Sequence, residues 1–173
     1  MTEEQVSANT LKLNAYTDAS ISEEGEATSV IMLVGNKGRS LHSVHLINFG
    51  FQKVRNIVKF ELDTKIAAMV LAPKKSLNGV VSDSEGSVLM LKTYAQTSRL
   101  GKLRHHLSDE DISILDQARN HQPGVDFYYL SRKKYIMRLT DNFSRLARGQ
   151  DKGCKSYTGA KGKTLSDQVN MMY

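Results

Sequence analysis

The stretch Gly35-Asn36-Lys37-Gly38-Arg39-Ser40 combines two glycines with two basic residues, as a loop that binds a nucleotide phosphate would. A phosphate-binding loop of this kind needs four residues between its glycines and then Lys-Ser or Lys-Thr, so that consecutive backbone amides surround the phosphates. Here two residues separate the glycines, and Arg-Ser follows. We therefore interpret this stretch as a turn that carries positive charge.

The histidines and the cysteine form no pattern typical of a metal site or a nucleophile. His42 and His45 share a face only in a helix, and the adjacent His105 and His106 cannot easily share a metal. The single cysteine, Cys154, lies in a glycine-rich segment, whereas a catalytic cysteine needs a base held rigidly beside it. The acidic residues show no spacing that marks a general acid and base pair, although folding can also form one. We therefore expect no enzymatic activity, no metal and no cofactor.

Charge is spread unevenly along a chain whose formal net charge is +6. Residues 1–30 hold six acidic residues against one basic residue, whereas residues 130–163 hold ten Lys or Arg against two Asp. Such asymmetry favours a polyanionic partner, either nucleic acid or an anionic membrane surface. The alternative is a solvated basic face that binds nothing.

The candidate binding residues lie in the basic turn and in two basic clusters that contain few acids. Contacts to phosphate need long cationic side chains on a fixed scaffold, which a loop beside a helix supplies. Tyr128, Tyr129 and Tyr135 could stack on bases, but packing in the core is the more common role. No signature of a sequence-specific RNA-binding module or zinc finger is present. The candidates are Lys37, Arg39, Arg99, Lys102, Arg104, Arg132, Lys133, Lys134, Arg138, Arg145 and Arg148.

The residue pattern of the N-terminal half of the chain predicts a β-rich body. Thr10–Thr17 alternates apolar and polar residues, which predicts a half-buried strand, and Ala27–Val34 is rich in residues that favour a buried strand. Arg39–Gln52 continues as extended chain or as a short helix. Further segments placed in this β-rich body are Val54–Asp63, Lys65–Ala72 and Val88–Tyr94.

Two helices are predicted after residue 100. Ser108 is a good N-cap for a helix to about Asn120, because three acidic residues then follow at the positive end of the helix dipole. A second helix is predicted over Phe127–Ala147, where an apolar stripe lies beside a basic face. The fold class is therefore α+β, with an antiparallel sheet followed by two C-terminal helices. The predicted organisation is a flexible N-terminus over residues 1–9, a single α+β domain over 10–148, and a basic glycine-rich tail over 149–173.

Localisation is predicted from what the sequence lacks. No stretch approaches the roughly eighteen apolar residues that a membrane span needs. The start, Met1-Thr2-Glu3-Glu4, lacks the basic and then apolar order of a secretory signal. A lone cysteine fits a reducing compartment. We expect the cytosol, or a particle assembled there.

The segment Met32–Gly50 contains the basic turn Gly35–Arg39 and then the apolar run Val44–Gly50. It resembles a segment of rhabdovirus matrix proteins, in which a glycine-bounded basic turn leads into an apolar strand ending in Phe/Leu-Gly. Thr10–Thr17 resembles the preceding first strand of that fold. The resemblance implies a small, basic, non-enzymatic virion protein, with an antiparallel sheet packed with helices, that condenses ribonucleoprotein and links it to the envelope.

The sequence also departs from that family. The animal-virus members have a long basic N-terminal arm and a proline-rich budding motif, whereas this N-terminus is acidic and the prolines are Pro73 and Pro123. The basic C-terminal third would then have to replace the arm.

Taken together, these patterns favour a matrix-like assembly protein of the virion and host-cell cytoplasm. It would form homo-oligomers, bind RNA or nucleoprotein, and link it to an anionic membrane. The alternative is a basic nucleic-acid-binding regulator or single-strand-binding protein. A third class, an enzyme acting on a phosphorylated substrate, would have a deep pocket lined by Lys37 and Arg39 with a carboxylate or histidine nearby.

Overall fold

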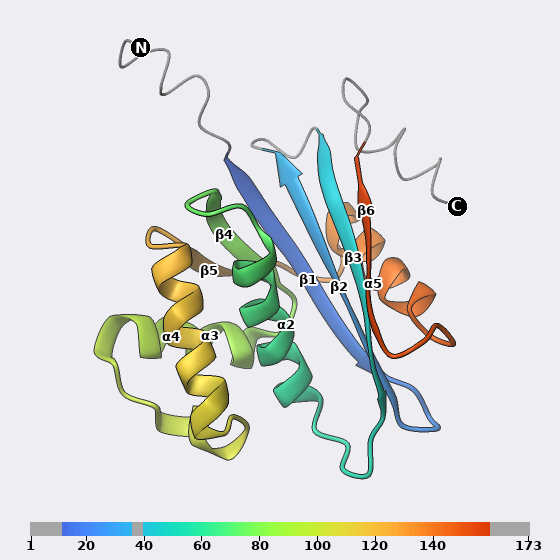
Figure 1. Cartoon of the computed structure of the whole chain (residues 1–173), viewed down its shortest axis with the longest axis horizontal. Helices are drawn as coiled ribbons and strands as arrows, with labels where there is room; N and C mark the ends of the chain where they lie inside the picture. The colour runs from blue at the N-terminus through green and yellow to red at the C-terminus, as the bar shows by residue number, and fades with distance from the viewer. Residues whose placement is uncertain (1–11, 36–39, 160–173) are drawn as a thin grey trace.

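The computed structural model describes residues 12–35 and 40–159, which form a six-stranded mixed sheet with helices on both faces (Figure 1). The strands are β1 (Leu13–Ile21), β2 (Glu26–Gly35), β3 (Leu41–Phe51), β4 (Leu77–Ser82), β5 (Asp126–Tyr129) and β6 (Gly153–Thr158). Their order across the sheet is β5-β4-β1-β2-β3-β6. Strand β4 pairs in parallel with β1 and β5, whereas β1, β2, β3 and β6 pair antiparallel in succession.

The helical segments divide between the two faces of the sheet. They are α2 (Ile57–Leu71), α3 (Glu85–Thr97), the 3-10 helix η2 (Gly101–His105), α4 (Asp109–His121) and α5 (Tyr135–Leu146). Helices α2, α3 and α4 cover one face and α5 covers the other (Figure 1). Ile31 packs in the core beneath α2, and its neighbour Met32 packs beneath α5 with Phe143. Strand β2 is therefore buried on both faces, which explains its continuous apolar run.

The predicted architecture, an antiparallel sheet followed by two C-terminal helices, is wrong. The chain is α+β, but β4 makes the sheet mixed and the helices lie between strands. Parallel neighbours need a long crossover connection, and α3, η2 and α4 form the one between β4 and β5. No helix within the described residues is long and apolar enough to cross a bilayer.

Two segments predicted as β-rich are helical. Val54–Asp63 and Lys65–Ala72 lie mostly in α2, which buries residues on several sides between the sheet and α4. An apolar pattern that surrounds a helix does not show the helical period, so periodicity could not separate helix from strand here. Val88–Tyr94 lies in α3, where the buried Val88, Leu91 and Tyr94 recur every third residue. That spacing favours a helix, but the β propensity of the residues in this segment led to the prediction of a strand.

The remaining predictions differ in outcome. The strand at Ala27–Val34 is confirmed, and so is the helix after Ser108, whose hydroxyl and backbone complete a capping box with Asp111. The predicted helix Phe127–Ala147 is confirmed only over Tyr135–Leu146, because β5 and a turn precede α5. Strand β6 lies within residues 149–173, the predicted tail, and pairs with β3. The predicted domain bounds otherwise stay a prediction.

Gln122, directly after α4, ties three elements together. Its side chain is buried, and its amide nitrogen donates to the backbone oxygens of Met69, Ala72 and Pro73 at 3.2, 3.2 and 2.9 Å. Its Oε1 accepts a hydrogen bond of 3.0 Å from the backbone nitrogen of Leu77. The end of α2, the start of β4 and the end of α4 therefore depend on one amide group.

We expect Gln122→Ala to lower the free energy of unfolding by about 2–4 kcal/mol, because it leaves buried backbone groups without partners. Urea unfolding followed by circular dichroism measures this change. The matched control is Gln117→Ala on the exposed face of α4, which should change stability by less than about 0.5 kcal/mol. Equal losses in the two variants would contradict this account of Gln122.

Candidate active site

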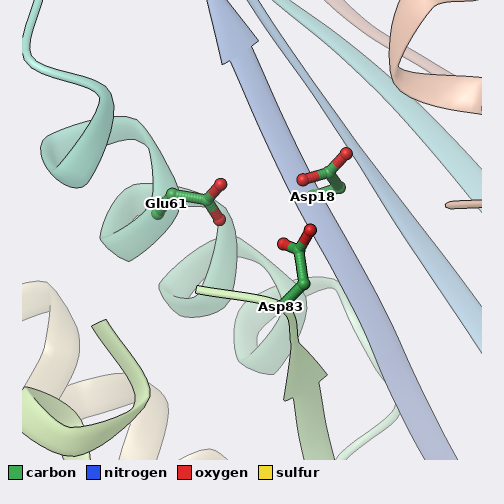
Figure 2. A group of neighbouring side chains, drawn as sticks. All are labelled: Asp18, Glu61 and Asp83. Atoms are coloured by element: carbon green, nitrogen blue, oxygen red, sulfur yellow. The ribbon is translucent and has the colours of Figure 1, made fainter. Parts of the chain in front are cut away.

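Three carboxylates from distant parts of the sequence meet at one end of the central strands. They belong to Asp18 on β1, Glu61 on α2 and Asp83 at the end of β4. One oxygen of each lies within 4.8 Å of the other two, and Figure 2 shows the three side chains directed toward one another. We call Asp18, Glu61 and Asp83 the carboxylate cluster.

The parallel register of β1 and β4 positions the two aspartates. Thr17 is paired with Ser82, so Asp18 and Asp83 are the next residues on the two neighbouring strands. The Thr17 hydroxyl also donates to the backbone oxygen of Val81 at 3.2 Å, which holds the strands together beside the cluster. Because β4 ends at Ser82, the aspartates lie at its carboxyl end, where open sheets with parallel strands bind ligands.

Glu61 joins the cluster because the first turns of α2 pack on β1. Asn56 caps the helix by accepting a hydrogen bond from the Lys59 backbone nitrogen, and Phe60 packs against Ala19 of β1. The Ala19 backbone nitrogen lies beyond the last residue of β1 that pairs with β4, and it donates to Glu61 Oε1 at 3.4 Å. Because β4 ends before it reaches Ala19, the backbone N–H of Ala19 does not pair with β4 and can orient the Glu61 carboxylate.

Burial makes the cluster electrostatically costly. Asp18 is 1% exposed and Glu61 is 6% exposed. Within the part of the chain that the structure describes, neither carboxylate oxygen of Asp18 has a hydrogen-bond partner. Burial raises the pKa of Asp18 from 3.8 to about 8, and the neighbouring carboxyls of Glu61, Asp83 and Asp141 add to this effect. Burial also raises the pKa of Glu61. Such a group of like charges is stabilised either by protonation or by a bound cation.

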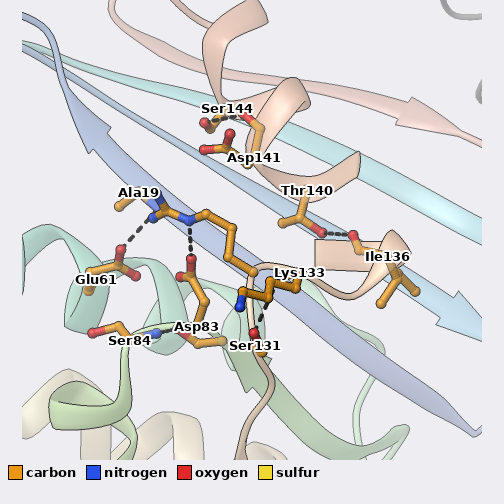
Figure 3. A network of polar contacts seen from close by, with 12 residues as sticks. Ala19, Glu61, Asp83, Ser84, Ser131, Lys133, Ile136, Thr140, Asp141 and Ser144 are labelled. Atoms are coloured by element: carbon orange, nitrogen blue, oxygen red, sulfur yellow. Dashed lines mark hydrogen bonds and ion pairs between the residues drawn. The ribbon is translucent and has the colours of Figure 1, made fainter. Parts of the chain in front are cut away.

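A fourth carboxyl and an arginine adjoin the cluster. Asp141 on α5 lies near enough to Asp18 to help raise its pKa, and Figure 3 shows Asp141 across β1 from Glu61 and Asp83. Arg132, in the turn before α5, donates through Nε to Asp83 Oδ2 at 2.7 Å. Asp141 Oδ2 also lies 3.4 Å from an Arg145 guanidinium nitrogen. Both faces of the sheet therefore contribute to the site.

The donor set fits a hard divalent cation. Mg²⁺ and Mn²⁺ prefer carboxylate oxygens, and the three clustered carboxylates offer oxygens close enough to share an ion. The unpartnered oxygens of Asp18 are the strongest sign, because buried polar atoms normally have partners. Asp18, Glu61 and Asp83 would hold the ion, with Asp141 beside them. This site was not predicted from the sequence.

An open pocket of about 690 Å³ lies beside the cluster. Acidic and basic side chains both line it, so it presents carboxylates next to cations. Its lining includes Asp83, Tyr129, Arg132, Lys133, Arg138 and Asp141. Three of the predicted binding residues therefore adjoin the carboxylates.

The structure separates the predicted binding residues into two groups. Lys37 and Arg39 lie outside the described residues. Arg99, Lys102 and Arg104 are exposed in and just before η2, in the helical layer opposite α5. The second group is exposed around α5, where Arg148 also donates to the Ser20 hydroxyl at 3.3 Å. That group comprises Arg132, Lys133, Lys134, Arg138, Arg145 and Arg148.

No protein-family model matches the sequence, and no curated protein matches it. A solved structure with a similar fold is the N-terminal RNase H domain of rv2228c from Mycobacterium tuberculosis, determined as a fusion with maltose-binding protein. The TM-score is 0.51 at 11% sequence identity, and the match covers 79% of this chain and 96% of that chain. The likeness supports a shared fold and carries no residue roles. It does not bear on the resemblance to rhabdovirus matrix proteins, which stays a prediction.

One local signal pointed to the site. Asp18 directly follows the predicted strand Thr10–Thr17, but the sequence pattern places it in a polar, acidic loop over Asp18–Glu26. In the structure β1 continues through Asp18 to Ile21, so the aspartate is part of the strand. Glu61 and Asp83 had no comparable signal, because only the fold brings them to Asp18.

The raised pKa of Asp18 predicts a pH-dependent stability. Its folded-state pKa of about 8 exceeds the ordinary 3.8, so the unfolded chain releases this proton first and stability falls as pH rises from about 4 to 8. Asp18→Asn removes this dependence. In buffer with a chelator, we expect the variant to be more stable than the wild type at pH 8–9, by roughly a few kcal/mol.

Urea unfolding at several pH values tests this expectation. The control is Asp151→Asn, which changes an exposed aspartate and should follow the wild-type pH profile. Parallel pH profiles for wild type and Asp18→Asn would show that the Asp18 carboxyl is not strained by burial.

Proposed function

We propose that the chain is a divalent-cation-dependent nuclease that hydrolyses phosphodiester bonds in RNA, with the RNA strand of an RNA–DNA hybrid as substrate. The observation that carries the proposal is the buried carboxylate cluster with its unpartnered Asp18 oxygens. The fold likeness to a domain named RNase H supports this class of substrate.

The carboxylate cluster and Asp141 would have different roles in the reaction. A divalent cation bound by carboxylates can lower the pKa of a water molecule and neutralise charge on a phosphate. Asp18, Glu61 and Asp83 would hold it, and their position at the end of β4 faces the open pocket beside them. Asp141 lies beside them and raises the pKa of Asp18.

The basic side of the pocket would position the substrate. Lys133 and Arg138 are exposed, and within the described residues neither forms a salt bridge, so both are available to phosphate oxygens. Arg132 differs, because it is paired with Asp83. Contacts to phosphate fix the register of a nucleic acid without reading its sequence, in agreement with the absence of a sequence-reading motif.

This proposal departs from the non-enzymatic expectation and keeps the predicted RNA binding. Self-association, a nucleoprotein partner, contact with an anionic membrane and a matrix-like role in a virion stay separate predictions. Those predictions give the buried carboxylates no task, which is why we prefer the nuclease.

The purified chain is expected to cleave a labelled RNA–DNA hybrid in Mg²⁺ or Mn²⁺, and a chelator should abolish cleavage. Asp83→Asn should lower the rate by roughly two orders of magnitude or more, the scale of a single catalytic group. The exposed variant Asp151→Asn is the control and should keep full activity. Gel assays on hybrid, single-stranded RNA and duplex DNA measure the preference. The absence of cleavage of all three would refute the proposal.

The double substitution of Lys133 and Arg138 by alanine should raise KM for the hybrid and leave kcat nearly unchanged, because it removes uniform binding of the phosphates. The salt dependence of binding should also become shallower, by roughly one to two counterions. Lys53→Ala, an exposed lysine outside the lining of this pocket, is the control. A fall in kcat at constant KM would assign the pair to the chemical step.

A further inference from the structure

Lys65 is a buried charge that the proposed nuclease chemistry leaves unexplained. It lies on α2 one helical turn after Glu61, and its side chain is 0% exposed. Lysine is rarely buried without a partner, because removing an ammonium group from water costs several kcal/mol. Its partner here is a member of the carboxylate cluster.

The contacts of Lys65 fix its ammonium group against the cluster. Nζ donates to Glu61 Oε2 at 3.4 Å and to the Glu61 backbone oxygen at 3.2 Å. Burial lowers the pKa of Lys65, whereas the nearby Glu61, Asp18 and Asp83 each favour its charged form. All three carboxylates therefore lie within electrostatic reach of one ammonium that cannot swing into solvent.

The other cation at the site is held differently. Arg132 contacts Asp83, but its side chain is 65% exposed, so a substrate phosphate can draw it away. Asp141 is left out of the charge balance because it is paired with Arg145. If Asp18, Glu61 and Asp83 are all ionised and Arg132 has turned to a phosphate, Lys65 balances one of their three negative charges. The two that remain equal the charge of one divalent cation.

We propose that Lys65 is a built-in cation of the carboxylate cluster and takes the place of a second metal ion, so that the cluster binds one divalent cation. Carboxylate sites of nucleases can hold two such ions about 4 Å apart. In this chain the ammonium of Lys65 supplies one of those positive charges from within α2. The inference depends on the proposed function only for the role of the bound ion, which is to assist cleavage.

Counting Mn²⁺ bound to the full chain tests the inference without an activity assay. Calorimetric titration, checked by the electron paramagnetic resonance of free Mn²⁺, should give one ion for the wild type. Lys65→Met keeps the length of the side chain and removes the charge, so it should bind two ions, the first roughly tenfold more tightly than the wild type.

The matched control is Lys59→Met on the same helix. Lys59 also forms an ion pair with the residue four positions later, at 2.9 Å from Asp63, but its side chain is 39% exposed. This variant should bind one ion. If Lys65→Met does not fold, Lys65→Gln provides the neutral side chain with a hydrogen-bond donor.

Each outcome decides the inference separately from the nuclease proposal. Two ions on the wild type, none on the wild type, or an unchanged count and affinity in folded Lys65→Met or Lys65→Gln would overturn it. One ion on the wild type and two on a Lys65 variant would support it, even if no nucleic acid is cleaved. Cleavage by a wild type that binds two ions would support the nuclease and refute the role of Lys65.

Discussion

Repulsion among buried carboxylates is the constraint on which the site depends. Each of Asp18, Glu61 and Asp83 would be more stable in water than beside the other two, and burial raises the pKa of Asp18 to about 8. The surrounding fold must therefore hold them together against this cost. It does so with the parallel pairing of β1 and β4, the packing of Phe60 on β1, and the hydrogen bond from Ala19 to Glu61.

The same constraint explains why the cations around the site differ in kind. Lys65 is buried and fixed, Arg132 is exposed and paired with Asp83, and Lys133 and Arg138 line the adjoining pocket. The basic side chains thus range from a buried lysine on α2 to side chains that solvent or a phosphate can reach. A site built this way keeps some of its charge balanced before any ion or substrate arrives.

Local signals made part of this fold predictable. The buried strand Ala27–Val34 and the capped helix after Ser108 depend on neighbouring residues, and both are present. Helix α2 was not predictable, because its wide burial conceals the helical period. Charge alone singled out Arg132, Lys133 and Arg138, which line the pocket, and their binding of a polyanion stays a prediction. The acidic half was missed because Asp18, Glu61 and Asp83 meet only through strand register and helix packing.

The basic sequence and the acidic site agree once the substrate is considered. A protein that only coats a polyanion gains nothing from buried carboxylates, because each one repels the polymer. A protein that cleaves a polyanion uses both signs of charge. Exposed cations hold the phosphates, and carboxylates would hold a divalent cation that lowers the pKa of water and neutralises charge on a phosphate. Pocket-lining Arg138 beside Asp141 and Asp83 provides both within one open space. In the proposed nuclease, the carboxylates would give the basic surface a chemical role that charge alone did not suggest.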